Sequence, residues 1–228
     1  MIPVHDPIPA LLDLIARWVP DLTVEHRVDP SHIPEFIPPP LRELYKATGN
    51  YPVPFTEQWR LPNWTRGLFG RQDQLLPIDT LRLIDNRFRF VHENQGVWWC
   101  ETLANELDPP VYSDATAYEY GDSEGTMREV CSSLSHFLTT FCLQEIVLGS
   151  QHLLCVDSPV DDPASLVSGQ IADIWIKGWY AFGRPTHSFY LCERSLFIMD
   201  CWGDYWLAYN DDDARVLVDS RAETRIIH

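Results

Sequence analysis

The strongest constraint on the fold is the separation of helical patterns from strand patterns along the chain. From residue 188 onward, short aromatic or branched runs follow one another: "SFYLCE", "LFIMDCW", "YWLAYN" and "ARVLVDS". Turn signals at Arg194-Ser195, Gly203-Asp204 and Asp211 to Asp213 separate these runs, which predicts the strands of an antiparallel meander. Because the helical patterns lie elsewhere, the sequence favours an α+β fold over a doubly wound parallel sheet.

Three helices are predicted from the spacing of apolar residues. The first covers residues 8–19 and is ended by Pro20. The second lies in "PPPLRELYKATGN", where the prolines suit the first turn and Gly49 is a natural residue just past the helix end. The third begins at a capping box formed by Thr126 and Glu129, with apolar residues at helical spacing behind it.

A β-hairpin is predicted from "NRFRFVH" and "VWWCE", which are joined by a turn at Glu93 to Gly96. On a strand, Trp98 and Trp99 point to opposite faces, so we expect one to fill the core and the other to be partly exposed. The stretch "DPPVYSD" extends the chain again, since its prolines forbid a helix. Residues 51–76 show no clean period and are interpreted as an irregular connection.

With 228 residues and 45% hydrophobic composition, the chain is long enough for one substantial core. We expect a single domain over residues 1–228, composed of an N-terminal helical segment (1–35), a central part (36–148) and a C-terminal β-meander (149–228). The start of the chain lacks the features of a secretory signal and no apolar run is long enough to cross a bilayer, so a soluble, cytoplasmic protein is expected. The six cysteines contain no CxxC pair, which predicts reduced, mostly buried thiols.

The negative charge is unevenly placed. The chain carries a net charge of −16, and residues 91–125 hold eight acidic residues but no Lys or Arg. Solubility alone explains the total charge. A cluster of this kind repels nucleic acid and anionic membranes, and it favours association with a basic protein.

The common local signatures of catalysis are missing from the sequence, including those of phosphate-binding loops, serine hydrolases, zinc proteases and deaminases. The leading catalytic candidate is His187 with Cys192 and Asp200, but these side chains belong equally well to a packed sheet. The run Asp211 to Asp213 lacks the spaced oxygens of a calcium loop, and no histidine has partners at metal-ligand spacing. We therefore expect no enzymatic activity, no cofactor and no metal.

Three stretches together resemble the SUKH superfamily, the proteins related to the yeast regulators of cell-wall synthesis. They are "IPPPLRELYKATGN", "RFVHENQGVWWCETLANELDPPVY" and "SLSHFLTTFCLQEIVL". The family pattern has a proline-led helix, Glu-Asn-Gln-Gly before a Trp-bearing strand, an Asp-Pro-Pro-Val extension and a helix with Phe-Leu. These motifs lie at Pro40 to Gly49, Glu93 to Trp99, Asp108 to Val111 and Phe137-Leu138. The resemblance covers residues 36–148, and the first 35 residues match no family motif.

The resemblance implies a single SUKH-like domain with a central, mainly antiparallel sheet and helices packed against it. It also implies a non-enzymatic protein, in bacteria usually an immunity protein that neutralises a cognate toxin, often a nuclease or deaminase, delivered by a neighbouring cell. Its Glu-Asn-Gln-Gly and Asp-Pro-Pro motifs are structural in the family. Eukaryotic relatives are regulatory scaffolds, and this alternative stays open, as does a cysteine-dependent hydrolase.

We expect an acidic surface to bind the toxin, because complementary charge speeds association and an acidic protein that covers a cationic substrate channel blocks a nuclease. Neither nucleic acid nor a membrane is expected as a partner. The predicted partner-binding residues are Glu101, Glu106, Asp108, Asp114, Glu119, Asp122, Glu124, Asp211, Asp212 and Asp213.

Overall fold

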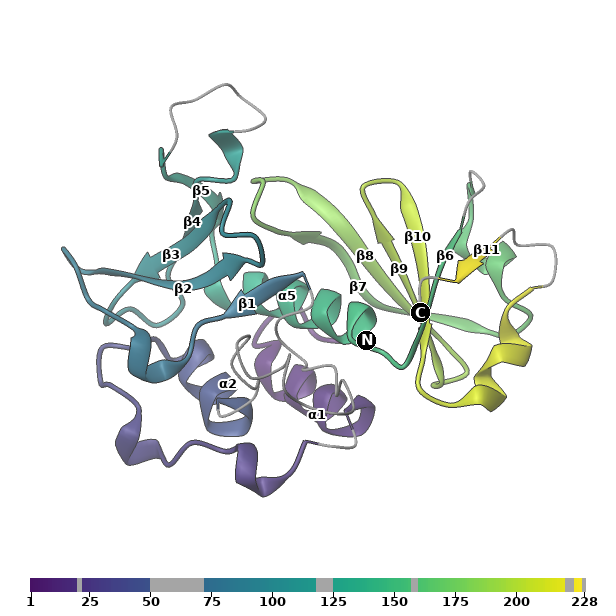
Figure 1. Cartoon of the computed structure of the whole chain (residues 1–228), viewed down its shortest axis with the longest axis horizontal. Coiled ribbons are helices and arrows are strands. Elements are labelled where there is room, and N and C mark those ends of the chain that lie inside the picture. The colour runs from purple at the N-terminus through teal and green to yellow at the C-terminus, as the bar shows by residue number, and fades with distance from the viewer. Residues whose placement is uncertain (20–21, 50–71, 118–124, 157–159, 220–223, 227–228) are drawn as a thin grey trace.

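Two antiparallel β-sheets stand side by side along the long axis of the molecule, with α5 (Leu134–Leu148) between them (Figure 1). The computed structural model describes residues 1–19, 22–49, 72–117, 125–156, 160–219 and 224–226. The predicted α+β class and the antiparallel pairing are confirmed. The prediction of one central sheet is wrong, because the strands divide into two sheets that pack on common helices.

The first sheet has the strand order β1-β2-β3-β4-β5. Its strands are β1 (Asp73–Leu75), β2 (Arg87–Glu93), β3 (Trp99–Leu103), β4 (Val111–Ser113) and β5 (Arg128–Cys131). The second sheet has the order β11-β6-β10-β9-β8-β7. Its strands are β6 (His152–Val156), β7 (Ile171–Trp179), β8 (Pro185–Cys192), β9 (Leu196–Cys201), β10 (Asp204–Tyr209) and β11 (Thr224–Ile226).

The other helices are α1 (Ile8–Trp18) and α2 (Pro39–Thr48), which pack against each other and against α5. Both were predicted from the apolar spacing. The short 3₁₀ helices are η1 (Val24–His26), η2 (Pro30–His32), η3 (Ile78–Thr80), η4 (Pro163–Leu166) and η5 (Asp212–Leu217).

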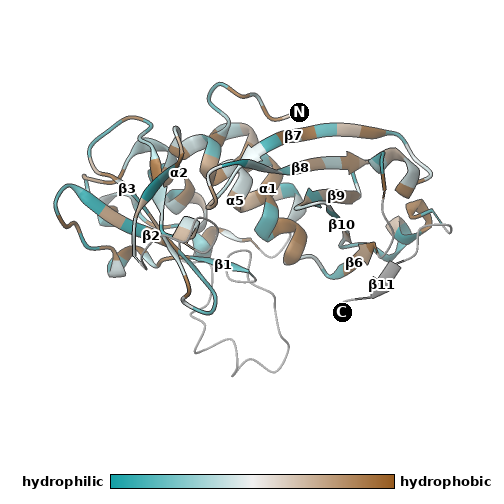
Figure 2. Cartoon of the chain, turned by 90° about the horizontal axis from the view of Figure 1, so that it is seen from above, coloured by the Kyte–Doolittle hydropathy of each residue, from teal (hydrophilic) through white to brown (hydrophobic). Residues whose placement is uncertain are grey.

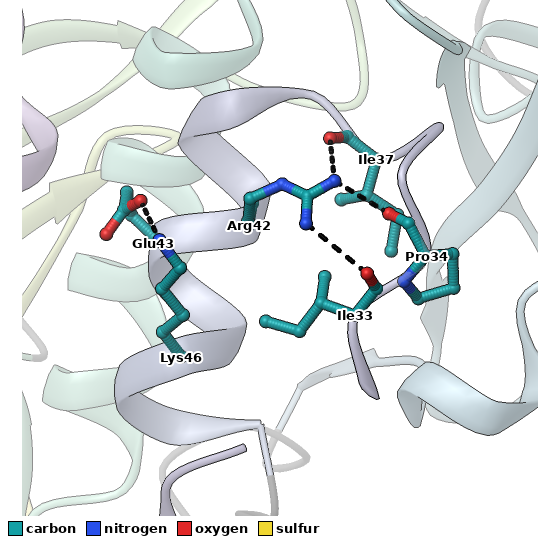
Figure 3. A network of polar contacts seen from close by, with 6 residues as sticks. All are labelled: Ile33, Pro34, Ile37, Arg42, Glu43 and Lys46. Carbon is teal, nitrogen blue, oxygen red and sulfur yellow. Dashed lines mark hydrogen bonds and ion pairs between the residues drawn. The ribbon is translucent and has the colours of Figure 1, made fainter. Parts of the chain in front are cut away.

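Arg42 on α2 anchors the loop that precedes the helix. Its guanidinium donates hydrogen bonds to the backbone carbonyls of Ile33, Pro34 and Ile37 at 2.8 to 3.4 Å (Figure 3). One planar group with several donors therefore satisfies carbonyls that no helix or strand would pair. This clamp ties the irregular segment before α2 to the helical layer.

Gly49 ends α2 for a reason other than the predicted one. Its φ is −68°, so it does not adopt the left-handed conformation that commonly calls for glycine past a helix end. A Cβ at this position would lie 2.5 Å from the carbonyl oxygen of Tyr45 and 2.7 Å from Cγ2 of Val28. Glycine is required here by the close approach of the Val28 segment to the helix end.

The predicted hairpin is formed by β2 and β3. The side chain of Glu93, only 7% exposed, accepts hydrogen bonds from the backbone N–H groups of Gln95 at 2.8 Å and Val97 at 3.3 Å, and so holds the turn. Trp98 is buried and Trp99 is half-buried. The prediction that one tryptophan fills the core and the other is partly exposed is confirmed.

The third predicted helix begins later than the capping-box pattern indicates. Residues Arg128–Cys131 form β5, which pairs with β4. Helix α5 starts after Ser133, whose Oγ accepts a hydrogen bond from the backbone N–H of His136 at 3.1 Å. The prediction of a start at Thr126 is wrong because pairing with β4 satisfies the backbone groups of this segment, and a local pattern contains no information about that distant partner.

The predicted C-terminal meander is confirmed from β8 to β10. The turn between β9 and β10 is Trp202-Gly203, with φ values of 61° and 88°, one residue earlier than predicted. "ARVLVDS", predicted as a strand, lies largely in η5. Asp211 caps this 3₁₀ helix by accepting a hydrogen bond from the backbone N–H of Asp213 at 3.0 Å, so the acidic run starts a helical turn and does not form a hairpin tip.

One apolar cluster includes residues of both sheets and of α1, α2 and α5. Figure 2 shows α5 and α1 at the centre of the molecule, between β2 and β3 on one side and β9 and β10 on the other. Twelve of the fifteen residues of α5 are buried, as expected for a helix enclosed on all sides. A second cluster covers the opposite face of the second sheet, so β9 is apolar on both faces.

Four of the six cysteines are buried and two are half-buried. Within the described ranges, no helix is both long and apolar enough to span a membrane.

Candidate functional site

The predicted acidic residues do not form one surface. Residues 101–114 belong to the first sheet and its loops, whereas Asp211 to Asp213 start η5 at the opposite end of the long axis (Figure 1). Glu119, Asp122 and Glu124 lie outside the described residues. The structure therefore does not bring the two acidic groups together.

Two of the predicted contact residues use their carboxylates within the fold. Asp114, 7% exposed, accepts a hydrogen bond from the backbone N–H of Trp99 at 2.7 Å. Asp108 accepts hydrogen bonds from the backbone N–H of Ser135 at 2.7 Å and from the hydroxyls of Ser133 and Ser135 at 2.7 and 2.9 Å. Asp108 thus helps to cap α5, where a negative charge is favourable.

Arginines of β2 offset the acidic charge on the first sheet. Nη1 of Arg87 lies 2.8 Å from Oε1 of Glu101, and the same guanidinium stacks on the ring of Tyr112 at 4.0 Å. Arg89 stacks similarly on Trp99 at 5.0 Å. The predicted acidic segment holds no Lys or Arg itself, but strand pairing places two arginines beside it. This face is consequently less acidic than the sequence segment.

The remaining predicted acids are exposed. Glu106 stands in the loop between β3 and β4 beside Leu107, which is 82% exposed. At the other end, the carboxylate of Asp212 lies 2.9 Å from Nε2 of His152, at ion-pair distance but without hydrogen-bond geometry. Asp213 is exposed, and Asp211 caps η5.

An acidic groove of about 500 Å³ lies at the N-terminal end of α5. Its lining includes the carboxylates of Asp6, Asp108 and Glu129, together with Val4 and Trp179, which are 72% and 40% exposed. Among the described residues that line it there is no Lys or Arg. Exposed aromatic and aliphatic side chains surrounded by charge of one sign are typical of a surface that binds an oppositely charged protein.

The groove is assembled by β7 and the N-terminal segment. The backbone N–H of Ile2 donates a hydrogen bond to the carbonyl of Ile174 at 3.0 Å, which places the start of the chain against β7. The backbone N–H of Trp179 donates to Nε2 of His136 at 3.2 Å, which joins the end of β7 to α5. Asp6 adopts a φ of 52°, a left-handed conformation that Asp tolerates better than most residues.

His136, which lines the groove, adds no positive charge to it at pH 7. Burial lowers the pKa of this histidine below its ordinary value of 6.5, and the opposing effect of Asp108 is smaller. His136 therefore does not offset the carboxylates of the groove.

The three residues of the catalytic candidate do not meet. His187 and Cys192 are five positions apart on β8, and the partner of Asp200 across the sheet is Ser188. Because side chains alternate along a strand, His187 faces α5 whereas Cys192 and Asp200 face the other side.

His187 belongs to a buried polar cluster with Asp73, Gln144, Tyr180 and Cys201. The Tyr180 hydroxyl and Nε2 of Gln144 donate to Oδ2 of Asp73 at 2.5 and 2.9 Å. Nε2 of His187 lies 2.8 Å from Oε1 of Gln144 and 3.0 Å from Sγ of Cys201. The members come from α5 and from both sheets, so the cluster links the two halves of the molecule.

Cys201 is not activated by His187. Since Gln144 donates to Asp73 through its nitrogen, its oxygen must accept from Nε2 of His187, which therefore carries a proton and is no base for the thiol. Burial lowers the pKa of His187 to about 4 and raises the pKa of the Cys201 thiol to about 12. A nucleophilic cysteine needs the opposite shifts.

Sequence reasoning missed Asp6, Glu129 and Trp179 as members of a common site. They lie in three separate parts of the chain, and no local pattern connects them. Within the described ranges, no group of three or more His, Cys, Asp or Glu side chains is placed to hold a metal ion.

Comparisons with known proteins found no protein family, curated protein or solved structure that matches this chain.

Proposed function

We propose that this chain is an immunity protein that binds a basic protein toxin and blocks it, with the acidic groove as the contact site. The observation that carries the proposal is the groove itself, where three carboxylates surround exposed Val4 and Trp179 and the described lining contains no Lys or Arg. Negative charge speeds the encounter with a cationic partner, and the tryptophan supplies an anchor. A nuclease binds its polyanionic substrate in a cationic channel, so an acidic protein that covers this channel inhibits without any chemistry.

The resemblance to the SUKH superfamily supports the same class of function. Glu93 holds the β2–β3 turn and Asp108 caps α5, and both roles fit the structural part that the family pattern implies for these motifs. Residues outside the motifs then make the contacts with the partner, and Asp6, Glu129 and Trp179 lie outside the motifs. The proposal includes a cytoplasmic location, since a nuclease or deaminase acts on nucleic acid there.

The first experiment is co-expression of this chain with each toxin-like domain that its neighbouring genes encode. Rescue of growth and a complex that survives purification support the proposal. No rescue and no complex contradict it, and an unbiased pull-down from the native cytoplasm then tests for the host partners of a regulatory scaffold.

The groove is tested by a double variant, Asp6→Asn with Glu129→Gln. These side chains are exposed, so folding is retained, and Asn suits the left-handed backbone at position 6. We expect association with the toxin to slow by about tenfold at low salt and the difference to vanish at high salt. Asp108 is not replaced, because loss of its capping carboxylate would lower the stability of the fold and so affect binding indirectly.

The matched control is Asp161→Asn with Asp213→Asn, which removes the same charge from exposed positions away from the groove. It is expected to change the association rate by less than about twofold. Equal effects of the two variants would show that net charge, and not the groove, determines binding.

A further inference from the structure

A second groove, of about 700 Å³, lies on the face of the first sheet that is turned away from α5. Phe90 of β2 packs on Phe137 of α5, with the ring centroids 5.7 Å apart. Because side chains alternate along a strand, the adjacent Arg89 points away from the helix and into this groove. Among the described residues, the groove shares no lining residue with the acidic groove. We refer to it as the arginine groove.

The arginine groove carries an excess of positive charge in a protein whose net charge is −16. Its lining includes Arg82, from the segment after η3, and Arg87 and Arg89 of β2. The acidic residues of the described lining are Asp85 and Glu101, so the three arginines exceed the carboxylates by one charge. The sign is opposite to that of the acidic groove, which indicates a different ligand.

Arg89 presents a guanidinium that no carboxylate of the described chain pairs with. Its side chain is exposed and lies over the ring of Trp99, 5.0 Å from the ring centre. The residue opposite it on β3 is Glu101, but the carboxylate of Glu101 pairs with Arg87 at 2.8 Å. A guanidinium stacked on an aromatic ring still donates hydrogen bonds through its edge, and the stacking reduces the conformational entropy that the side chain loses on binding.

Arg82 supplies a second positive charge that is held in place by neutral groups. Its Nη1 donates hydrogen bonds to the backbone carbonyl oxygens of Asp79 at 2.7 Å and Leu81 at 2.9 Å. Within the described part of the chain it forms no ion pair, and its Nε and Nη2 have no hydrogen-bond partner. The planar donors of a guanidinium match the paired oxygens of a carboxylate or a phosphate, so these free donors favour an oxyanion.

Apolar side chains complete the lining of the arginine groove. Ile84 is 69% exposed, and Leu76 and Trp99 are half-buried. A ligand that covers these side chains removes apolar surface from water, which favours binding. The volume lies within the range of about 300 to 1,000 Å³ typical of small-molecule sites. Positive charge beside apolar walls therefore fits a small molecule with an anionic head and an apolar body.

We propose that the arginine groove binds a small organic anion with an apolar body. The edge of the Arg89 guanidinium donates hydrogen bonds to the oxyanion, and the charge of Arg82 on the same lining adds to the attraction. The apolar body lies against Ile84, Leu76 and Trp99. The oxyanion is either a carboxylate or the phosphate of a phosphate ester, and the two share this chemistry because each offers paired oxygens to a guanidinium.

The test is calorimetric titration of the full chain at low salt with 3-phenylpropionate and, separately, with phenyl phosphate. We expect saturable binding of at least one of them, with a dissociation constant on the order of 1 mM, as fits a small ligand. Tighter binding of one compound identifies the anionic group, and equal binding shows that the groove accepts both.

The neutral analogue 3-phenylpropanol is titrated in parallel. It is expected to bind at least about tenfold more weakly than the tighter anion, because a neutral hydroxyl forms a weaker hydrogen bond with a guanidinium than an oxyanion does. An equal affinity for the neutral analogue, or no saturable signal with either anion, overturns the proposal.

Two variants of one exposed residue assign the binding to the groove. Arg89→Gln removes the charge and should weaken binding of the tighter anion about tenfold. Arg89→Lys retains the charge but loses the planar donors, and should weaken it about threefold. Because Arg89 forms no ion pair or hydrogen bond within the described chain, both variants are expected to keep the circular dichroism spectrum of the wild type.

The matched control is Arg17→Gln, which removes the same charge from an exposed position on α1. It is expected to change the affinity by less than about twofold. Undiminished binding by Arg89→Gln, or an equal loss with Arg17→Gln, overturns the proposal. None of these variants alters a residue of the acidic groove, so the result is independent of the toxin experiment.

Discussion

Replacing Asp73 by Asn should stabilise the protein at neutral pH. The carboxyl group is buried, and it faces a second carboxyl group on α5, so burial first and Glu145 second raise the pKa of Asp73 from 3.8 to about 8. The titratable groups that face it from the surrounding elements are Glu145, Glu93, Tyr180, Cys100 and Cys201. None of them is basic, and the hydrogen bonds from Tyr180 and Gln144, which favour the charged form, have a smaller effect than burial and Glu145.

The sign and size of the effect follow from proton linkage. Between pH 4 and pH 8 the folded chain retains a proton that the unfolded chain releases, so the free energy of unfolding falls as the pH rises. At about 1.4 kcal/mol per pH unit, the cost to the wild type is on the order of 1 to 2 kcal/mol at pH 5 and on the order of 4 kcal/mol at pH 7. Asn does not titrate and retains the hydrogen bonds from Tyr180 and Gln144, so the variant avoids this cost.

The assay is urea unfolding of wild type and Asp73→Asn at pH 5, 6 and 7, followed by tryptophan fluorescence. The difference between the two free energies of unfolding cancels the titration of all groups that do not interact with Asp73. The exposed variant Asp79→Asn should show a small and constant difference. A difference for Asp73→Asn that does not grow with pH, or a variant less stable than wild type at pH 7, would refute the reasoning.

Two further predictions concern helix ends. Ser133→Ala removes the cap of α5 and should lower the free energy of unfolding by about 1 kcal/mol. Thr126→Ala changes the residue that the capping-box pattern predicted as the start of the helix, and it should leave the far-UV circular dichroism unchanged. Gly49→Ala should lower the free energy of unfolding by about 1 to 3 kcal/mol, because the added Cβ would lie 2.5 Å from Tyr45 and 2.7 Å from Val28. If the midpoint of chemical denaturation equals that of the wild type, the neighbouring loop moves away from the Cβ without a cost in stability.

Elements with a clear local pattern were predictable. Their patterns involve only residues close together in the sequence: the apolar spacing of α1 and α2, the alternation of β2, and the runs of β8 to β10 with turns between them. Strands β1, β6 and β7 were not found. β1 has only three residues, and β7 contains register shifts and carries exposed polar residues among its buried ones, so neither shows a clean period of two.

The candidate site was less predictable than the fold. Excess negative charge in residues 91–125 is visible in the sequence, yet Arg87 offsets Glu101, and Asp108 and Asp114 hold the backbone. The predicted partner of His187 was Cys192, but the structure supplies Cys201. Charge and residue type can be read from a chain, whereas the partners of each side chain depend on which strands pair.

The sequence by itself determined the α+β class, the helices α1 and α2, the β2–β3 hairpin and the order of the C-terminal meander, because these depend on contacts between residues close along the chain. Only the tertiary structure decided that the strands divide into two sheets around α5, that Asp6, Asp108 and Glu129 meet in one groove, and that Asp73 is buried against Glu145. Each of these depends on segments far apart in sequence, whose pairing is set by the burial of a shared core and by backbone hydrogen bonds that no local pattern records.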